Sequence, residues 1–262
     1  IMKVWQLISE MNWTSRMGLL VVSVFGFCAI FAPWLAPYGQ SEIVGDVWEP
    51  LFGNFFFGTD QIGRDMLSML IYGARNMIAL ALLTTGCAFG LGSLLGFLAA
   101  TMGGWVDQVL SRFVDVVISI PTLIFALIVL SSTGTSIFAL VTVIAIIYAM
   151  PVYRIARAVA MDIEVMDYVE AARLRGEGLW WIMRKEILPN ALTPLAAEFG
   201  LRFCFVFLLI SGLSFLGLGL QPPLADWGAM VRDTGGGIAW GFMHPLVPAT
   251  CIALLTIGIN LI

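Results

Sequence analysis

Two ionisable residues interrupt a long apolar segment of the sequence. Glu198 and Arg202 are four residues apart, which places them on one face of a helix, and Arg202 lies about 20 Å along such a helix from Pro189. Charged groups at membrane depth cost about 2.5 kcal/mol or more, so they pair or face water or protein. The spacing fits an ion pair within the helix. It also fits a pair that lines the inner half of a solute route and helps a charged solute to leave.

Other residue types that carry chemistry are scattered. His244 is the only histidine, and the four cysteines fall in apolar segments without CxxC spacing: Cys28, Cys87, Cys204 and Cys251. We therefore expect small core residues rather than disulfides or a metal site. Neither lysine, Lys3 or Lys185, follows a glycine, so the phosphate-binding pattern GxxxxGK[ST] does not occur. The chain is expected to be non-catalytic, and any ATP must be hydrolysed by another chain.

The elements that must position these residues are membrane helices. The chain has 262 residues, of which 60% are hydrophobic and 11% charged, and its mean hydropathy is +0.96. So few charges exclude a soluble domain, and a helix needs roughly 20 apolar residues to cross a bilayer. Uncharged runs predict an all-α integral membrane protein with six transmembrane helices: residues 17–36, a helix within 76–106, two within 116–153 that separate at 131–136, about 192–220 and about 245–262.

Basic residues predict the orientation. With a cytoplasmic N-terminus, the outer segments hold Arg64, Arg75 and Arg232, and the inner segments hold the larger set Lys3, Arg16, Arg112, Arg154, Arg157, Arg173, Arg175, Arg184 and Lys185. The positive-inside rule therefore places both termini in the cytoplasm. A net charge of −4 gives no reason to expect a nucleic-acid partner.

Two local contacts are also expected within the spans. Four glycines in the second span, Gly86, Gly90, Gly92 and Gly96, would bring helix backbones close together. Arg112 and Asp115 are three residues apart near a helix end and are expected to pair with each other.

A polar stretch separates the fourth and fifth predicted spans and reads YVEAARLRGEGLWWIMRKEILPN. Apolar residues at helical spacing predict an amphipathic helix that includes Met161, Val165, Tyr168, Val169 and Ala172. Gly176 and Gly178 suit its end and a turn, and a second short helix follows, which Pro189 limits. One interpretation is an interfacial linker, with Trp180 and Trp181 at headgroup level and Arg184 and Lys185 facing lipid phosphates.

The order of residues in this stretch also resembles a known motif. Glu170, Ala171 and Ala172, then Gly176, then Ile187, Leu188 and Pro189, resemble the EAA loop of ATP-binding-cassette importer permeases. Three further stretches, residues 57–75, 103–121 and 213–230, are similar to the C-type permease subunit of the oligopeptide, dipeptide and nickel importer family. The sequence departs from that family's usual pattern at Glu198 and Arg202, where uncharged residues are usual.

The resemblance implies a type I importer transmembrane domain at residues 76–262, with the EAA loop at about 161–190. Residues 1–75 would form an N-terminal transmembrane helix and an extracytoplasmic segment. The loop would dock on an ATPase subunit in the cytoplasm of a bacterium, Ala171 and Ala172 permitting close approach and Glu170 pairing with a basic group. The implied partners are a second permease, two ATPase subunits that carry ATP and Mg, an extracytoplasmic solute-binding protein and the lipid of the inner membrane.

Several functions remain open at this point. Peptides are the default solute, and nickel or metal chelates, opines and glycosides are transported by the same family. An ion-coupled secondary transporter would explain six spans and a charge pair within the membrane. That alternative predicts inverted repeats, which the sequence does not display, and it leaves the EAA-type stretch unexplained.

Overall fold

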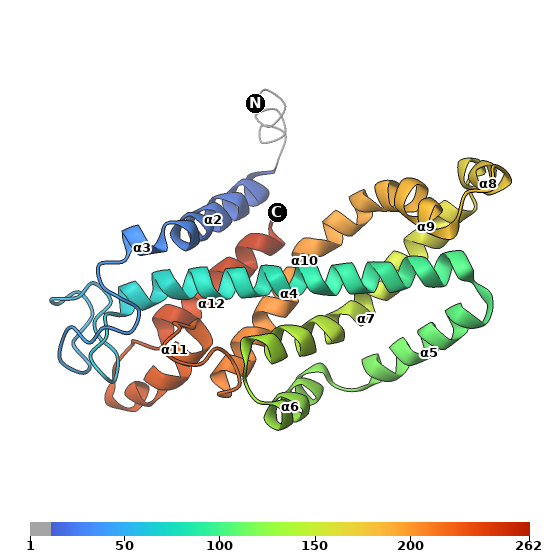
Figure 1. Ribbon diagram of the computed structural model, residues 1–262. Coiled ribbons are helices and arrows are strands. Elements are labelled where there is room, and N and C mark those ends of the chain that lie inside the picture. Colours follow the sequence, from blue (N-terminus) through green and yellow to red (C-terminus); the bar gives the residue numbers. More distant parts are fainter. Residues whose placement is uncertain (1–11) are drawn as a thin grey trace. The chain divides into compact units, whose positions relative to one another are not determined.

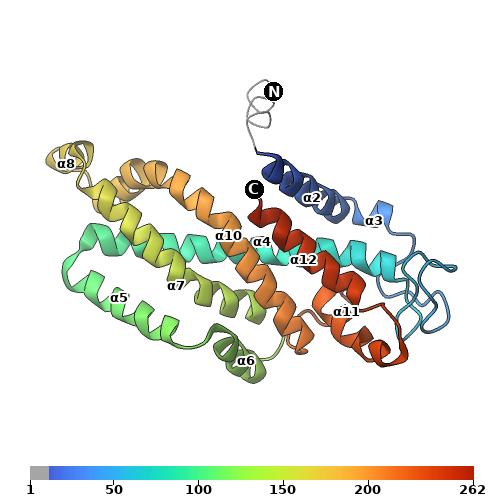
Figure 2. The same ribbon diagram turned by 180° about the vertical axis from the view of Figure 1, so that it is seen from behind.

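Helices account for nearly all regular structure in the computed structural model, which describes residues 12–262 (Figures 1 and 2). Lys3, which contributed to the predicted orientation, lies outside the described residues. Within residues 12–262 the only β-type pairings are two isolated bridges. The elements are α2 (Trp13–Ile30), α3 (Ala32–Leu35), α4 (Met66–Met102), α5 (Gly104–Ser119), α6 (Thr122–Thr133), α7 (Ile137–Glu164), α8 (Asp167–Leu174), α9 (Leu179–Ile182), the π-helical turn η1 (Met183–Ile187), α10 (Leu188–Phe215), α11 (Trp227–Thr234), the 3₁₀ turn η2 (Gly235–Trp240) and α12 (Leu246–Asn260).

The predicted all-α membrane fold is confirmed, but the count of six spans is not. Four continuous helical segments in the described residues are long and apolar enough to cross a bilayer: Trp13–Ile30, Met66–Met102, Ile137–Glu164 and Leu179–Phe215. A fifth span is obtained if the bent pair α5 and α6 crosses as one unit. The sixth predicted span corresponds to α12, which has 15 residues and is shorter than the roughly 20 that a full crossing needs.

The third predicted span is broken rather than straight. We expected one helix from residue 116 to the polar turn, whereas α5 and α6 meet at an angle of 88°. Pro121 causes the break, because a proline disfavours helical backbone in the residue before it, and Ile120 is extended at φ −84° and ψ 128°. The second division is where the sequence placed it: Gly134, at φ +88°, ends α6 before α7 begins.

The structure divides into two compact units, which we describe separately. The first holds residues 12–81, 135–137 and 207–262. Within it α2 lies along α12, and a Cβ on Gly18 would lie only 2.5 Å from the Gly258 carbonyl oxygen. This close approach uses small residues, as is common between membrane helices.

A buried tryptophan anchors the first unit. The Trp227 indole N–H donates to the Leu70 carbonyl at 2.9 Å, and a Cβ on Gly73 would lie 2.6 Å from its ring. Asp226 is the N-cap of α11, the helix that Trp227 begins, and its carboxylate accepts from the N–H groups of Gly228 and Ala229. Burial raises the pKa of Asp226, and this effect outweighs the lowering by its hydrogen bonds.

The second unit holds residues 82–134 and 138–206. Two of the four span glycines act as expected: a Cβ on Gly92 or Gly96 would lie 2.6 Å or 2.8 Å from the α7 backbone. Gly86 and Gly90 do not, because a Cβ there would meet nothing within 4 Å. Those two glycines therefore leave space beside α4 instead of bringing helices together.

Two ion pairs of the second unit join α5 to α7. The predicted pair between Arg112 and Asp115 is wrong, since Asp115 instead accepts from Arg154 at 2.6 Å. Asp107 pairs in the same way with Arg157. Both arginines lie on α7 and both acids on α5, so the two ion pairs join these helices at two separate positions.

Candidate functional site

The loop between α7 and α10 contains the residues of the predicted coupling motif. We expected a single helix through residues 161–172, but α7 ends at Glu164 and α8 starts anew at Asp167. Met166 between them is extended, at φ −79° and ψ 143°. The expected apolar face was therefore partly wrong, because Met161, Val165 and Tyr168 are exposed. The break reorients α8 so that Val169 turns inward.

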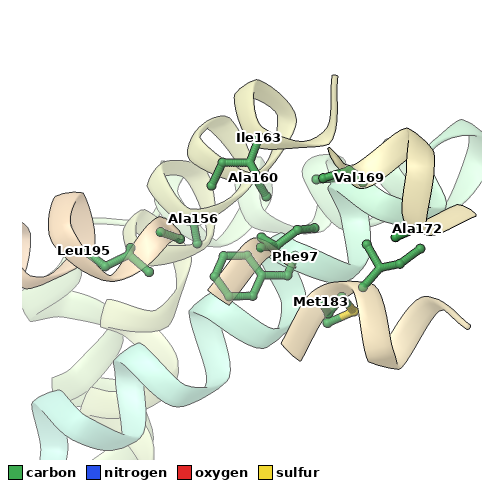
Figure 3. Packing of buried hydrophobic residues seen from close by; sticks show 12 residues of the cluster. Phe97, Ala156, Ala160, Ile163, Val169, Ala172, Met183 and Leu195 are labelled. Carbon is green, nitrogen blue, oxygen red and sulfur yellow. The ribbon is translucent and has the colours of Figure 1, made fainter. Parts of the chain in front are cut away.

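The inward face of α8 packs on the membrane helices. Val169 and Ala172 are both 0% exposed and belong to one apolar cluster (Figure 3). The other members come from α4, α7, α9, η1 and α10: Phe97, Ala100, Ala156, Ala160, Ile163, Ile182, Met183, Ile187, Ala191 and Leu195. A fully buried valine such as Val169 contributes about 1.5–3 kcal/mol, and the single methyl group of Ala172 contributes less. The eight-residue helix is thus fixed to three long helices by packing.

The outward face of α8 presents a different set of residues. Glu170 and Ala171 are exposed, and Glu170 forms no ion pair with any described residue. The two alanines of the motif therefore differ in role: Ala172 fills the cluster, whereas Ala171 is free to contact another molecule. Sequence order alone did not separate them.

Gly176 ends α8 in a left-handed conformation, at φ +82°. Its N–H donates to the Arg173 carbonyl at 2.9 Å, and the N–H of Glu177 donates to the Ala172 carbonyl at 3.1 Å. These two bonds form a Schellman cap, in which a residue other than glycine is strained. The glycine of the motif therefore turns the chain back toward α9.

The second half of the motif begins a membrane helix. We expected Pro189 to limit a short helix, but α9, η1 and α10 run on as one segment, Leu179–Phe215. Pro189 is the second residue of α10 and follows the π-helical turn η1. The wider turn accommodates a ring that an uninterrupted α-helix would exclude. Ile187 is buried in the cluster, whereas Leu188 and Pro189 are exposed.

Charged residues of the loop fall into two groups. Arg173 pairs with Glu164 on α7, and Arg175 lies 5.7 Å over the Trp181 ring and 4.0 Å from Glu186. Arg184 and Lys185, in contrast, form no ion pair with any described residue. The first group holds the loop together, and the second leaves positive charge uncompensated.

Glu198 and Arg202 contact each other across one helical turn of α10. Their side-chain oxygen and nitrogen lie 2.6 Å apart, and the side chains are 20% and 19% exposed. The Arg202 Nε is buried without a hydrogen-bond partner. The expected ion pair within the helix is therefore present, and it leaves donor capacity unused.

Arg202 also lines a pocket of about 330 Å³ at the bend between α5 and α6. Tyr148, Pro151 and Arg154 of α7 line the same pocket, and the Tyr148 hydroxyl donates to the Phe205 carbonyl at 3.0 Å. We did not predict these α7 residues from the sequence. Two prolines within apolar runs were the available signal, because Pro151 lines this pocket and Pro121 lies between two lining residues, Ile120 and Thr122.

These features define a multi-pass inner membrane permease. The family model for the binding-protein-dependent transport system inner membrane component matches residues 92–262, and the chain belongs to this family. The division of the chain at residue 75 into an N-terminal segment and this domain stays a prediction.

Related permeases are similar in sequence over most of the chain. The sequence is 36% identical to the di/tripeptide transport system permease protein DppC of Pseudomonas aeruginosa, over 93% of this chain and 83% of that protein. It is 34% identical to the probable D,D-dipeptide transport system permease protein DdpC of Escherichia coli, over 88% and 78%. A chain of the inward-facing MetNI methionine ABC transporter superposes with a TM-score of 0.61 at 20% identity, covering 74% of this chain and 93% of that one. This last similarity shows the fold.

Proposed function

We propose that the chain forms half of the translocation pore of an ATP-driven peptide importer and receives ATPase motion through α8. One observation carries this proposal: α8 is exposed at Glu170 and Ala171 and is buried at Val169 and Ala172 in a cluster shared with α4, α7 and α10. A subunit that displaces the exposed face must move the cluster with it. Ile187, in the second half of the motif, belongs to the same cluster, and Leu188 and Pro189 follow it.

The coupling requires differential contacts in two pore states. ATP binding to partner subunits favours one state only if α8 and its cluster fit that state better. Close packing makes this possible, because packed interiors switch between arrangements rather than deform continuously. Gly176 fixes the end of α8 through its cap, so that the helix moves as one piece.

The proposed assembly contains this chain, a second permease, two ATPase subunits and an extracytoplasmic solute-binding protein. ATP and Mg would bind to the ATPase subunits, and this chain would bind no cofactor. Both termini would lie in the cytoplasm, as the basic residues of the inner segments favour. Membership of this family favours such an importer over an ion-coupled secondary transporter.

Peptides are the proposed solutes because the two relatives described above are named as dipeptide or tripeptide permeases. Nickel or metal chelates, opines and glycosides remain alternatives within the family. In the proposed route, the solute passes Arg202 in its pocket near Tyr148, and Glu198 balances the charge of the arginine. The unused donor at Arg202 Nε supports a contact with an anionic group of the solute.

Co-purification tests the coupling role. The tagged chain is expressed with its neighbouring genes, purified in mild detergent and analysed by mass spectrometry. We expect two ATPase subunits and a second permease, and we expect the ATPase subunits to be lost from the Glu170→Arg variant. Asp162→Arg is the matched control, since Asp162 is exposed on α7, outside α8 and outside residues 170–189 of the motif. Retention of the ATPase subunits by Glu170→Arg would show that α8 is not their docking site.

Transport assays test the route separately. Arg202→Gln should change peptide uptake in reconstituted vesicles while ATPase activity coupled to the binding protein persists. Arg112→Gln removes an exposed arginine that does not line the pocket of Arg202 and should leave uptake as it is. Unchanged uptake kinetics in Arg202→Gln would remove this residue from the route.

A further inference from the structure

A groove beside the loop is not used by the proposed route, and it borders the cluster through which the coupling is proposed to act. It has a volume of about 650 Å³ and lies within the second unit, between α4, the segment α9–η1 and α10. Its lining is apolar except for Ser93 and one charged residue, Arg184. Gly90 keeps part of it open, because a Cβ at that position would meet no atom within 4 Å.

The charge at the groove is uncompensated. Arg173 and Arg175 of the same loop each have acidic partners, whereas Arg184 has none among the described residues. Trp180 lines the groove with Arg184 and is 62% exposed. A tryptophan beside a basic residue at the end of an apolar surface is the arrangement that membrane interfaces favour. An anion would neutralise the unpaired guanidinium of Arg184, and an apolar group would fill the apolar part of the groove.

We propose that this groove binds an anionic glycerophospholipid, with the phosphate at Arg184 and an acyl chain along Leu94, Leu192 and Phe199. A phospholipid of the surrounding membrane supplies both the anion and the apolar group. Basic pockets between membrane helices bind anionic headgroups, and 650 Å³ lies within the range of small-molecule sites, about 300–1,000 Å³. Only the choice of the cytoplasmic leaflet rests on the proposed orientation.

Its position favours a lipid over a helix of the second permease. The α4 and α10 residues of the groove belong to segments that are long and apolar enough to span a bilayer, so acyl chains have direct access. A packed apolar helix would leave the Arg184 charge buried without a partner, which is costly. A phospholipid brings its own counter-charge.

The lipid would also contact the coupling segment. Met183 and Leu188 line the groove on either side of the π-helical turn, and Met183 belongs to the cluster that holds α8. An occupied groove would therefore support this turn from the membrane side. The interfacial and coupling interpretations of the loop are then compatible, because α8 serves one role and α9–η1 the other.

Photo-crosslinking tests the site on the complex co-expressed with its partner subunits. The complex is placed in phosphatidylcholine nanodiscs containing a phosphatidylglycerol with a diazirine on its acyl chain, and labelled peptides are mapped by mass spectrometry. We expect labels on residues 188–199, with unlabelled phosphatidylglycerol competing and soluble glycerol phosphate failing to compete. Labels found only elsewhere on the chain would overturn the proposal.

Matched variants define the role of the charge. Arg184→Gln should lower labelling about five-fold, the effect of one basic residue near a membrane surface. Lys185→Gln removes the same charge one residue away, at a side chain that does not line the groove, and should have little effect. Equal losses in both variants would indicate general surface attraction, and no loss in Arg184→Gln would also refute the site.

A groove-filling variant separates the lipid from the second permease. Ala196→Trp should abolish labelling by occupying the groove, and Arg184→Gln decides the matter if that variant fails to fold. Ala196→Cys, treated with a short bifunctional crosslinker, should not join the two permeases. A crosslink to the second permease would assign the groove to a protein interface instead.

Discussion

The two adjacent alanines of α8 offer the sharpest test of how this helix is held. Ala172 is 0% exposed and lies in the cluster with Phe97 and Leu195, whereas Ala171 is exposed. Replacing Ala172 with leucine adds three carbon atoms to a packed site, which typically costs about 1–3 kcal/mol. The same change at Ala171 adds them at the surface, where the effect on stability is usually within about 0.5 kcal/mol.

Two measurements on the purified complex separate these effects. For a chain of this size, 1 kcal/mol corresponds to about 2–4 °C in melting temperature, so Ala172→Leu should melt about 2–12 °C lower and Ala171→Leu within about 2 °C of the wild type. Ala171→Leu should reduce the retention of the ATPase subunits more than Ala172→Leu does. Ala171→Leu obstructs the proposed docking face and should lose them while the permease pair stays folded.

The outcome that refutes this reasoning is specific. If Ala171→Leu lowers the melting temperature and Ala172→Leu does not, α8 is turned the other way and the cluster does not hold it. If neither variant changes stability while both lose the ATPase subunits, both alanines lie on the docking face. In that case motion would have to reach the membrane helices by a route other than the cluster.

Three further predictions concern backbone geometry and charge. Gly176→Ala should cost about 1–2 kcal/mol in a thermal melt, because its φ is +82°, whereas Gly178→Ala should be tolerated, since a Cβ at Gly178 meets nothing within 4 Å. Gly73→Ala should lower the melting temperature through a 2.6 Å contact with the tryptophan that begins α11, whereas Gly86→Ala in the same helix should stabilise by up to about 1 kcal/mol. Burial raises the pKa of Asp226, so its folded state binds a proton more tightly than the unfolded chain. We therefore compare the melting temperatures of the wild type and Asp226→Asn. The melting temperature of the wild type relative to that variant should fall as pH rises from about 4 through the pKa of Asp226 in the folded state. A relative melting temperature that rises with pH would contradict this direction.

Residue order located the candidate coupling loop, but not the direction in which its residues face. Glu170 to Pro189 could be recognised because the motif is local. The burial of Ala172 depends on Phe97 and Leu195, which lie far away in the chain and meet α8 only after the helices pack. An eight-residue helix has too few turns for periodicity to fix its orientation when its neighbours are unknown.

The prolines and the ion pairs also show that local sequence rules predict only part of the structure. Pro121 breaks its span in the manner that proline chemistry requires, whereas Pro189 does not end a helix because η1 widens the preceding turn. Asp115 had a possible partner three residues away and instead pairs with Arg154, 39 residues away. A local rule holds only where no tertiary partner competes, and these partners cannot be seen in a single sequence.

The shortness of α8 has a consequence for coupling. A helix of eight residues is not stable alone in water, since nucleation is unfavourable and about 12–15 residues are needed. Its order must therefore come from Val169 and Ala172 in the cluster and from the cap at Gly176. The same contacts that fold α8 are those through which it would move α4, α7 and α10. Variants that loosen the cluster should therefore weaken coupling in proportion to their loss of stability, whereas variants on the exposed face should weaken docking without that loss.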